Sequence, residues 1–210
     1  MDADRTDGLL TRARGGDAAA LSELFQAHEA RLLRLVELRL DARLRRRLDP
    51  ADVVQEAWLE AARRFEAWSA RGEPPFRVWL RLTAVQALAT AQRRHLGTGA
   101  RDAQREEFTE SRPSVSAASA AELFVASATS PSQGAHRAEL CARVLAALEE
   151  LDELDREIVA LRHFEGLSNE DAAAELAIEP AAASKRFVRA LLRLRPALEA
   201  LHSGVVSEGA

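Results

Sequence analysis

The chain has 210 residues, of which 47% are hydrophobic and 30% charged, and its formal net charge is −4 at pH 7. This composition is too apolar for a chain that is disordered throughout, and the apolar runs are too short for a membrane helix. A lone cysteine, Cys141, excludes an internal disulfide and a multi-cysteine zinc site. The first residues lack the basic-then-apolar order of a secretory signal, so we expect a cytoplasmic protein.

The charges are distributed unevenly. Residues 1–100 hold 17 arginines against 14 acidic side chains, whereas residues 139–210 hold 8 basic against 14 acidic ones. Inside that acidic part, residues 181–195 carry five basic side chains and no acidic one. Because DNA responds to the local field of a protein, the negative total does not exclude a nucleic-acid partner.

The N-terminal part is expected to be a bundle of helices, since no segment alternates β-branched and polar residues. Asp17 suits the N-cap of a helix with apolar positions at helical spacing as far as Leu40. After a basic patch at 43–47, residues 49–52 (Asp-Pro-Ala-Asp) supply the N-cap, first-position proline and first-turn acid of a second helix. A third helix is expected from Phe76, after two prolines.

Residues 109–136 are rich in Ser, Ala, Pro and Gly, and they are predicted to be a flexible linker. It would join a domain over residues 1–108 to a domain over residues 137–202, followed by a tail over 203–210. A long loop inside one domain is the alternative, but a loop of this length is unusual in a compact fold. A short apolar island at 121–125 is a candidate for transient contacts or for docking on a partner.

The C-terminal part is expected to contain helices over 138–151 and 152–164. Ser168 and Asp171 then form a capping-box-like start to a short helix that ends at Leu176. After a turn at 177–180 a longer helix begins, and Pro196 is expected to kink or interrupt its last turns. We therefore predict an all-α fold of two small helical domains.

The two last helices have the pattern of a helix-turn-helix, whose second helix enters the major groove. Lys185, Arg189 and Arg193 lie at i, i+4 and i+8 and share one face, with Arg186 beside them. Alanines at 181–183 keep the start of the helix slim, so that its backbone N–H groups can approach a phosphate. Surface helices are often basic, so the pattern alone favours DNA binding only modestly.

Longer segments resemble the extracytoplasmic-function (ECF) sigma factors of RNA polymerase. Residues 151–168 are similar to the first segment of that family's promoter-reading domain, and residues 185–191 to its recognition helix. Residues 49–58 (Asp-Pro-Ala-Asp-Val-Val-Gln-Glu-Ala-Trp) are similar to the helix that docks on the polymerase clamp, which is the most specific match. Residues 76–82, 93–96 and 130–132 resemble a subgroup with helical N-terminal extensions.

The resemblance implies that core RNA polymerase and promoter DNA are partners, that an anti-sigma protein is a further candidate, and that no cofactor is needed. The residues implied for the upstream element are Ser184, Lys185, Arg186, Arg189 and Arg193. Those implied for the melted minus-ten region are Arg77, Trp79, Arg81, Gln86, Arg93 and Arg94. Those implied for polymerase are Asp49, Asp52, Val53, Gln55 and Glu56. Aromatic side chains of this domain are expected in the core, with Trp79 the one candidate for base stacking.

The chain departs from the family pattern at Gln86 and Thr90, where Asn and Asp are common, and at Ala177, where Gly is common. Ala182 and Ala183 replace a Thr-Val pair. These departures imply either altered promoter specificity or weakened initiation. A left-handed backbone at Ala177 would be strained.

Two other function classes stay open. The chain could be a sigma-like adaptor that binds polymerase without directing initiation, or a stand-alone DNA-binding regulator. An enzyme is disfavoured, because the five histidines lack metal-ligand spacing and there is no Gly-rich phosphate loop.

Overall fold

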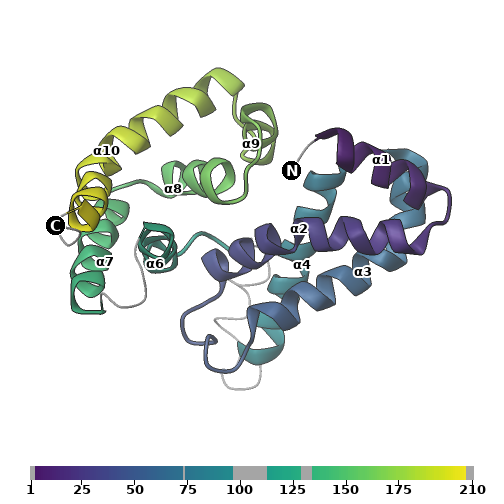
Figure 1. Ribbon diagram of the computed structural model, residues 1–210, viewed down its shortest axis with the longest axis horizontal. Helices are drawn as coiled ribbons and strands as arrows, with labels where there is room; N and C mark the ends of the chain where they lie inside the picture. Colours follow the sequence, from purple (N-terminus) through teal and green to yellow (C-terminus); the bar gives the residue numbers. More distant parts are fainter. Residues whose placement is uncertain (1–2, 73, 97–112, 129–133, 207–210) are drawn as a thin grey trace. The chain divides into compact units, whose positions relative to one another are not determined.

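Every regular element in the described residues of the computed structural model, which are 3–72, 74–96, 113–128 and 134–206, is a helix. This confirms the predicted all-α fold. The chain divides into two compact units, Met1–Pro113 and Ser114–Ala210, which Figure 1 shows in purple to teal and in teal to yellow. No helix among the described residues combines the length and the apolar character that crossing a membrane requires.

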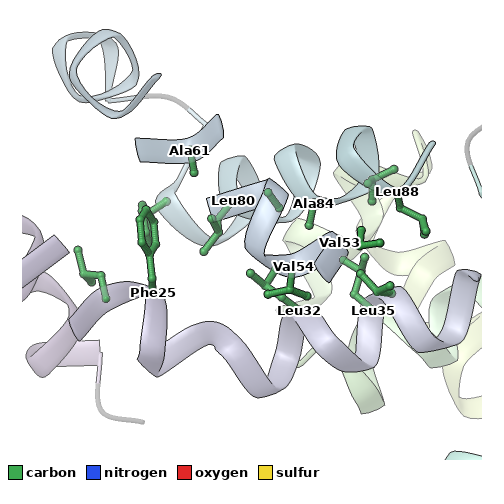
Figure 2. Close-up of a cluster of buried hydrophobic side chains, with 14 of the residues drawn as sticks. Phe25, Leu32, Leu35, Val53, Val54, Ala61, Leu80, Ala84 and Leu88 are labelled. Atoms are coloured by element: carbon green, nitrogen blue, oxygen red, sulfur yellow. The ribbon is translucent and has the colours of Figure 1, made fainter. Parts of the chain in front are cut away.

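Unit 1 is a bundle of α1 (Ala3–Arg14), α2 (Ala18–Arg39), α3 (Pro50–Arg71) and α4 (Phe76–Leu96). Helix α2 packs against the other three, and α3 packs against α4. Figure 2 shows how the core is shared between the last three helices. Its labelled side chains are Phe25, Leu32 and Leu35 from α2, Val53, Val54 and Ala61 from α3, and Leu80, Ala84 and Leu88 from α4. Burial of this apolar surface holds the bundle together.

The predicted helix starts in unit 1 are confirmed by their hydrogen bonds. The Asp17 carboxylate accepts from the backbone N–H groups of Ala19 and Ala20, both at 3.0 Å, at the start of α2. The Asp49 carboxylate accepts from the N–H of Ala51 at 2.9 Å at the start of α3. Each bond satisfies a donor that the first helical turn leaves without an intrahelical partner.

Unit 2 contains α6 (Ala117–Ala128), α7 (Gly134–Glu149), α8 (Glu153–Val159), the π-helical turn η1 (Ala160–Phe164), α9 (Asn169–Glu175) and α10 (Pro180–Val206). Its core beneath α9 and α10 is formed by Ile158, Leu161, Ala172, Ala173 and Ala183. The Ser168 hydroxyl accepts from the N–H of Asp171 at 3.0 Å and caps α9, as predicted. Pro196 was predicted to kink or interrupt α10, and the structure contradicts the interruption, because the helix continues through Pro196 to Val206.

Helix α6 lies inside residues 109–136, where the sequence predicted a flexible linker, and the structure differs from that prediction over 117–128. Phe124 and Val125 are buried, and the Phe124 ring packs on His163 and Phe164 of η1, with centroids 5.0 and 4.6 Å apart. The backbone N–H of Val115 donates to the Glu157 carboxylate of α8 at 2.7 Å. This segment is therefore part of the fold of unit 2. The remainder of the predicted linker lies largely outside the described residues.

Ala177, in the turn between α9 and α10, has a left-handed backbone with φ of +52°. A side chain at such a position costs roughly 1 to 2 kcal/mol. We expect Ala177→Gly to raise the free energy of unfolding by about 0.5 to 1 kcal/mol, since glycine's greater freedom in the unfolded chain offsets part of the relief. Urea unfolding monitored by circular dichroism measures the change.

The matched control is Ala174→Gly, at an exposed position inside α9. It should lower the free energy of unfolding by about 1 kcal/mol, as glycine does within a helix. Destabilisation of similar size by both substitutions would contradict a strained left-handed Ala177.

Candidate nucleic-acid and polymerase-binding surfaces

Helices α9 and α10 form a helix-turn-helix in which four residues, 176–179, separate the two helices. The Asn169 side-chain amide donates to the Pro180 carbonyl oxygen at 2.9 Å and ties the start of α10 to the start of α9. The inner side of α10 carries Ala183, Ala190 and Leu194, each fully buried. Their packing leaves the opposite side of α10 facing solvent (Figure 1).

The solvent-facing side of α10 carries most of the residues predicted to bind the upstream element. Ser184 and Lys185 are exposed, and the side chains of Arg189 and Arg193 are 53% and 49% exposed. Successive helical residues turn by about 100°, which places Lys185 near the centre of this side and Arg193 at its edge. The structure therefore brings Ser184, Lys185 and Arg189 together on the first turns of an accessible helix.

A buried carboxylate from α8 lies beneath this helix. Asp155 is only 1% exposed, and its Oδ1 accepts from Nη1 of Arg186 at 2.6 Å. The same carboxylate lies 3.8 Å from Nη2 of Arg189 and 4.0 Å from Nη1 of Arg193. Three arginines of α10 thus gather around one buried negative charge, which holds the helix on α8.

Arg186 forms its hydrogen bonds within unit 2. Its Nη1 also donates to Asp152 at 3.2 Å, and its side chain is only 28% exposed. The hydrogen bonds that Arg186 donates to the carboxylates of Asp155 and Asp152 raise the pKa of its guanidinium. The pKa of Asp152 is lowered mainly by the hydrogen bond from the backbone N–H of Asp155 and, to a smaller extent, by Arg186. The structure differs here from the predicted DNA contact, because helical spacing places Arg186 at the buried edge of the basic side.

Helix α3 presents most of the predicted polymerase-binding residues at its start. Asp52, Gln55 and Glu56 are exposed, and Asp49 is exposed while its carboxylate caps the helix. Val53 is 1% exposed and packs in the core of unit 1. Val53 therefore lies in the core and not on the surface, because the face of α3 that packs against α2 and α4 passes through it (Figure 2), and its contact with polymerase stays a prediction.

Helix α4 divides the predicted minus-ten residues between its surface and the core. Arg77, Gln86, Arg93 and Arg94 are exposed. Arg81 is 5% exposed, so it does not line a surface that a DNA strand can reach. This difference follows from the central place of α4, which packs against both α2 and α3 and is buried over a wide arc.

Trp79 belongs to an aromatic cluster. Its ring stacks on that of Trp68 with centroids 5.0 Å apart, and it also contacts Phe65 and Phe76. Trp68 is 2% exposed, and its Nε1 donates to the Pro74 carbonyl oxygen at 2.8 Å. One face of the half-buried Trp79 ring therefore packs against the core, where the other aromatic residues of this unit were predicted to lie.

A groove on the surface of unit 1 runs between α3 and α4. Its lining includes Glu56 from α3 and Gln86, Thr90 and Arg94 from α4. Nη1 of Arg94 lies 3.3 Å from a Glu56 carboxylate oxygen, and both side chains are at least half exposed. Residues predicted for two different partners, polymerase and DNA, therefore meet in one groove.

Comparison with known proteins agrees with this geometry. The family model described as "ECF sigma factor" matches residues 4–199. The ECF RNA polymerase sigma factors SigD of Mycobacterium bovis and Mycobacterium tuberculosis are 30% identical to the chain over 195 residues, which are 93% of this chain and 84% of each relative. The chain belongs to the ECF sigma factor family.

This membership associates the sigma factor with RNA polymerase, promoter DNA and transcription initiation. A solved structure with a similar fold is that of CnrH in complex with the cytosolic domain of CnrY. It is 24% identical in sequence, has a TM-score of 0.53, and covers 95% of this chain and 99% of its own. At this identity the likeness supports the fold and no finer property.

Two features of this ECF sigma factor escaped the sequence analysis. In the sequence Asp155 is one of many acidic residues, and only the packing of α8 under α10 shows that it is the counterion of arginines on α10. Val188 and Leu192 are 52% and 61% exposed on α10, between basic neighbours. Two apolar residues placed between basic ones, away from the buried side of α10, were the sequence signal that could have revealed them. Within the described ranges, no group of His, Cys, Asp or Glu side chains is arranged to hold a metal ion.

Proposed function

We propose that this sigma factor binds core RNA polymerase through the exposed start of α3 and directs it to specific promoters through α10. The observation that carries the proposal is the exposed trio Ser184, Lys185 and Arg189, on the first turns of a helix whose other side is packed. Arginine and lysine there suit guanine edges and phosphates in the major groove. Its place of action would be that of the polymerase, the cytoplasm.

Unit 1 supports the first half of this proposal, the binding of polymerase, and adds a contact with melted DNA. Asp52, Gln55 and Glu56 offer polar side chains on one accessible turn of α3. Arg77, Arg93 and Arg94 lie on the exposed side of α4, and positive side chains of this kind track the backbone of single-stranded DNA. Polymerase binding and contact with the melted minus-ten region are thus assigned to neighbouring helices of one unit.

The test is transcription by bacterial core polymerase with the purified full chain on genomic DNA. We expect transcripts that start at a defined set of promoters. Replacing both Lys185 and Arg189 with alanine should abolish this selectivity while co-purification with polymerase persists, since each base contact contributes about 1 to 3 kcal/mol.

The matched control is Arg195→Ala, which removes a cation of the same helix that pairs with Glu199 at 2.6 Å. It should initiate like the wild type. Absence of stimulated transcripts on every template, or full promoter selectivity in the Lys185/Arg189 double variant, would contradict the proposal.

A second candidate function is an adaptor that binds polymerase without opening promoters. It is favoured by Gln86 and Thr90, where the family commonly has Asn and Asp, and by the ion pair of Arg94 with Glu56. Co-purification with polymerase without promoter opening would identify it. An anti-sigma protein is a further proposed partner, and capture of one on the intact sigma factor would test that assignment.

A further inference from the structure

Val188 is an exposed apolar side chain on the helix that is proposed to read DNA, where an apolar side chain has few groups to contact. It is 52% exposed, although β-branched apolar residues are commonly buried. It lies on the third turn of α10, roughly 12 Å along the helix axis from Pro180. This is within the part of α10 that the proposed function places in the major groove.

The neighbours of Val188 indicate what covers it. Ser184 is one turn earlier on the same side, Lys185 lies three residues before it, and Arg189 follows it, all exposed. Residues 181–195 contain no acidic side chain. An apolar protein surface would have to desolvate these cations without compensation, whereas a DNA groove pairs them with phosphates and base acceptors. Charge complementarity therefore favours duplex DNA as the partner.

The floor of the major groove offers one apolar group, the C5-methyl of thymine. We propose that Val188 packs against a thymine methyl in the upstream promoter element and makes the sigma factor prefer thymine at one position. This inference rests on the proposed function of α10. It assigns base discrimination to Val188 in addition to Lys185 and Arg189, while Arg186 is held by Asp155.

The experiment uses holoenzyme assembled from core polymerase and the full chain. The holoenzyme first selects its upstream element from duplexes of random sequence. Each thymine of the selected element is then replaced, one at a time, by deoxyuridine, which lacks only the methyl group. We expect binding to weaken about fourfold at one position, the effect of losing one buried methyl group.

Val188→Ala should bind the thymine and deoxyuridine duplexes with equal affinity, because the contact is already lost. Leu192→Ala is the matched control: Leu192 is 61% exposed and lies one turn farther from the start of α10. It should keep the fourfold ratio. Both side chains are exposed, so neither change should unfold the domain.

The inference is overturned if Val188→Ala keeps the wild-type ratio, if the ratio is lost in Leu192→Ala instead, or if no thymine is sensitive to its methyl group. Each of these results leaves the proposed function intact, since an upstream element has been selected. Failure of the holoenzyme to select any element would instead overturn the proposed function, and this inference with it.

Discussion

Asp155→Ala is expected to lower the free energy of unfolding of unit 2 by about 3 kcal/mol, the cost of removing one partner from a buried ion pair. The carboxylate is 1% exposed and is hydrogen-bonded to Arg186. Without it, Arg186 keeps only the exposed Asp152, and the guanidinium stays partly buried beside α8. The more exposed Arg189 and Arg193 contribute little, because solvent screens their attraction.

Two optical signals separate the units in this experiment. All three tryptophans, at positions 58, 68 and 79, lie in unit 1. Tryptophan fluorescence therefore follows unit 1, while circular dichroism follows the helices of both. In urea, Asp155→Ala should shift the unfolding transition of unit 2, which circular dichroism detects. The unfolding transition of unit 1, which tryptophan fluorescence detects, should not shift.

Arg195→Ala is the control, because it breaks an ion pair of the same length, 2.6 Å, in which both side chains are more than 60% exposed. Its expected cost is below about 0.5 kcal/mol. In a double-mutant cycle, Asp155→Ala and Arg186→Ala should show a coupling of about 2 kcal/mol. Additive effects of these two substitutions would mean that the Arg186 guanidinium is available to contact DNA, as the family resemblance implied.

Phe124→Ala is expected to destabilise unit 2 by about 3 kcal/mol, as truncation of a buried aromatic side chain usually does. Phe124 is 4% exposed, and its ring contacts those of His163 and Phe164. The substitution would leave a cavity between α6 and η1. The same signals apply: dichroism should change and tryptophan fluorescence should not.

Leu192→Ala removes a large apolar side chain of the same unit that is 61% exposed, and it should change the free energy of unfolding by less than about 0.5 kcal/mol. If residues 117–128 were a linker without tertiary contacts, Phe124→Ala would change the free energy of unfolding as little as Leu192→Ala does. Equal, small effects of the two substitutions would thus restore the linker interpretation of residues 117–128.

The helices of both units were predictable where local chemistry decides them. Asp49 with Pro50, and Ser168 before a short apolar segment, marked helix starts that the hydrogen bonds confirm. These signals act within one helical turn, so they can be read from neighbouring residues. The helically spaced apolar positions of α2, as far as Leu40, likewise predicted which side of that helix forms the core.

The binding surfaces were less predictable, because exposure depends on partners far away in the chain. Arg186 shares a helix with Lys185, but Asp155, 31 residues earlier, takes its guanidinium. Arg81 and Val53 lie on helices that are covered by more than one neighbour. Spacing predicts which residues share a face, and only packing shows whether that face is open.

Helix α6 was missed for a related reason. Serine and proline near its ends gave the segment the composition of a linker, whereas alanine, which is frequent inside it, is the strongest helix former. A short helix of this kind is marginal in isolation and is stabilised by the surface on which it packs. That surface, provided by α7 and η1, is not visible in local sequence.

The docking of α6 has a practical consequence for dissecting the protein. A truncated chain that starts at residue 137 would strip the cover from Phe164 and lose the bond between Val115 and Glu157. Such a piece would carry bare apolar surface and tend to self-associate. If this fragment failed to bind DNA, the cause would be its damaged folding. An isolated C-terminal half should therefore begin before Val115.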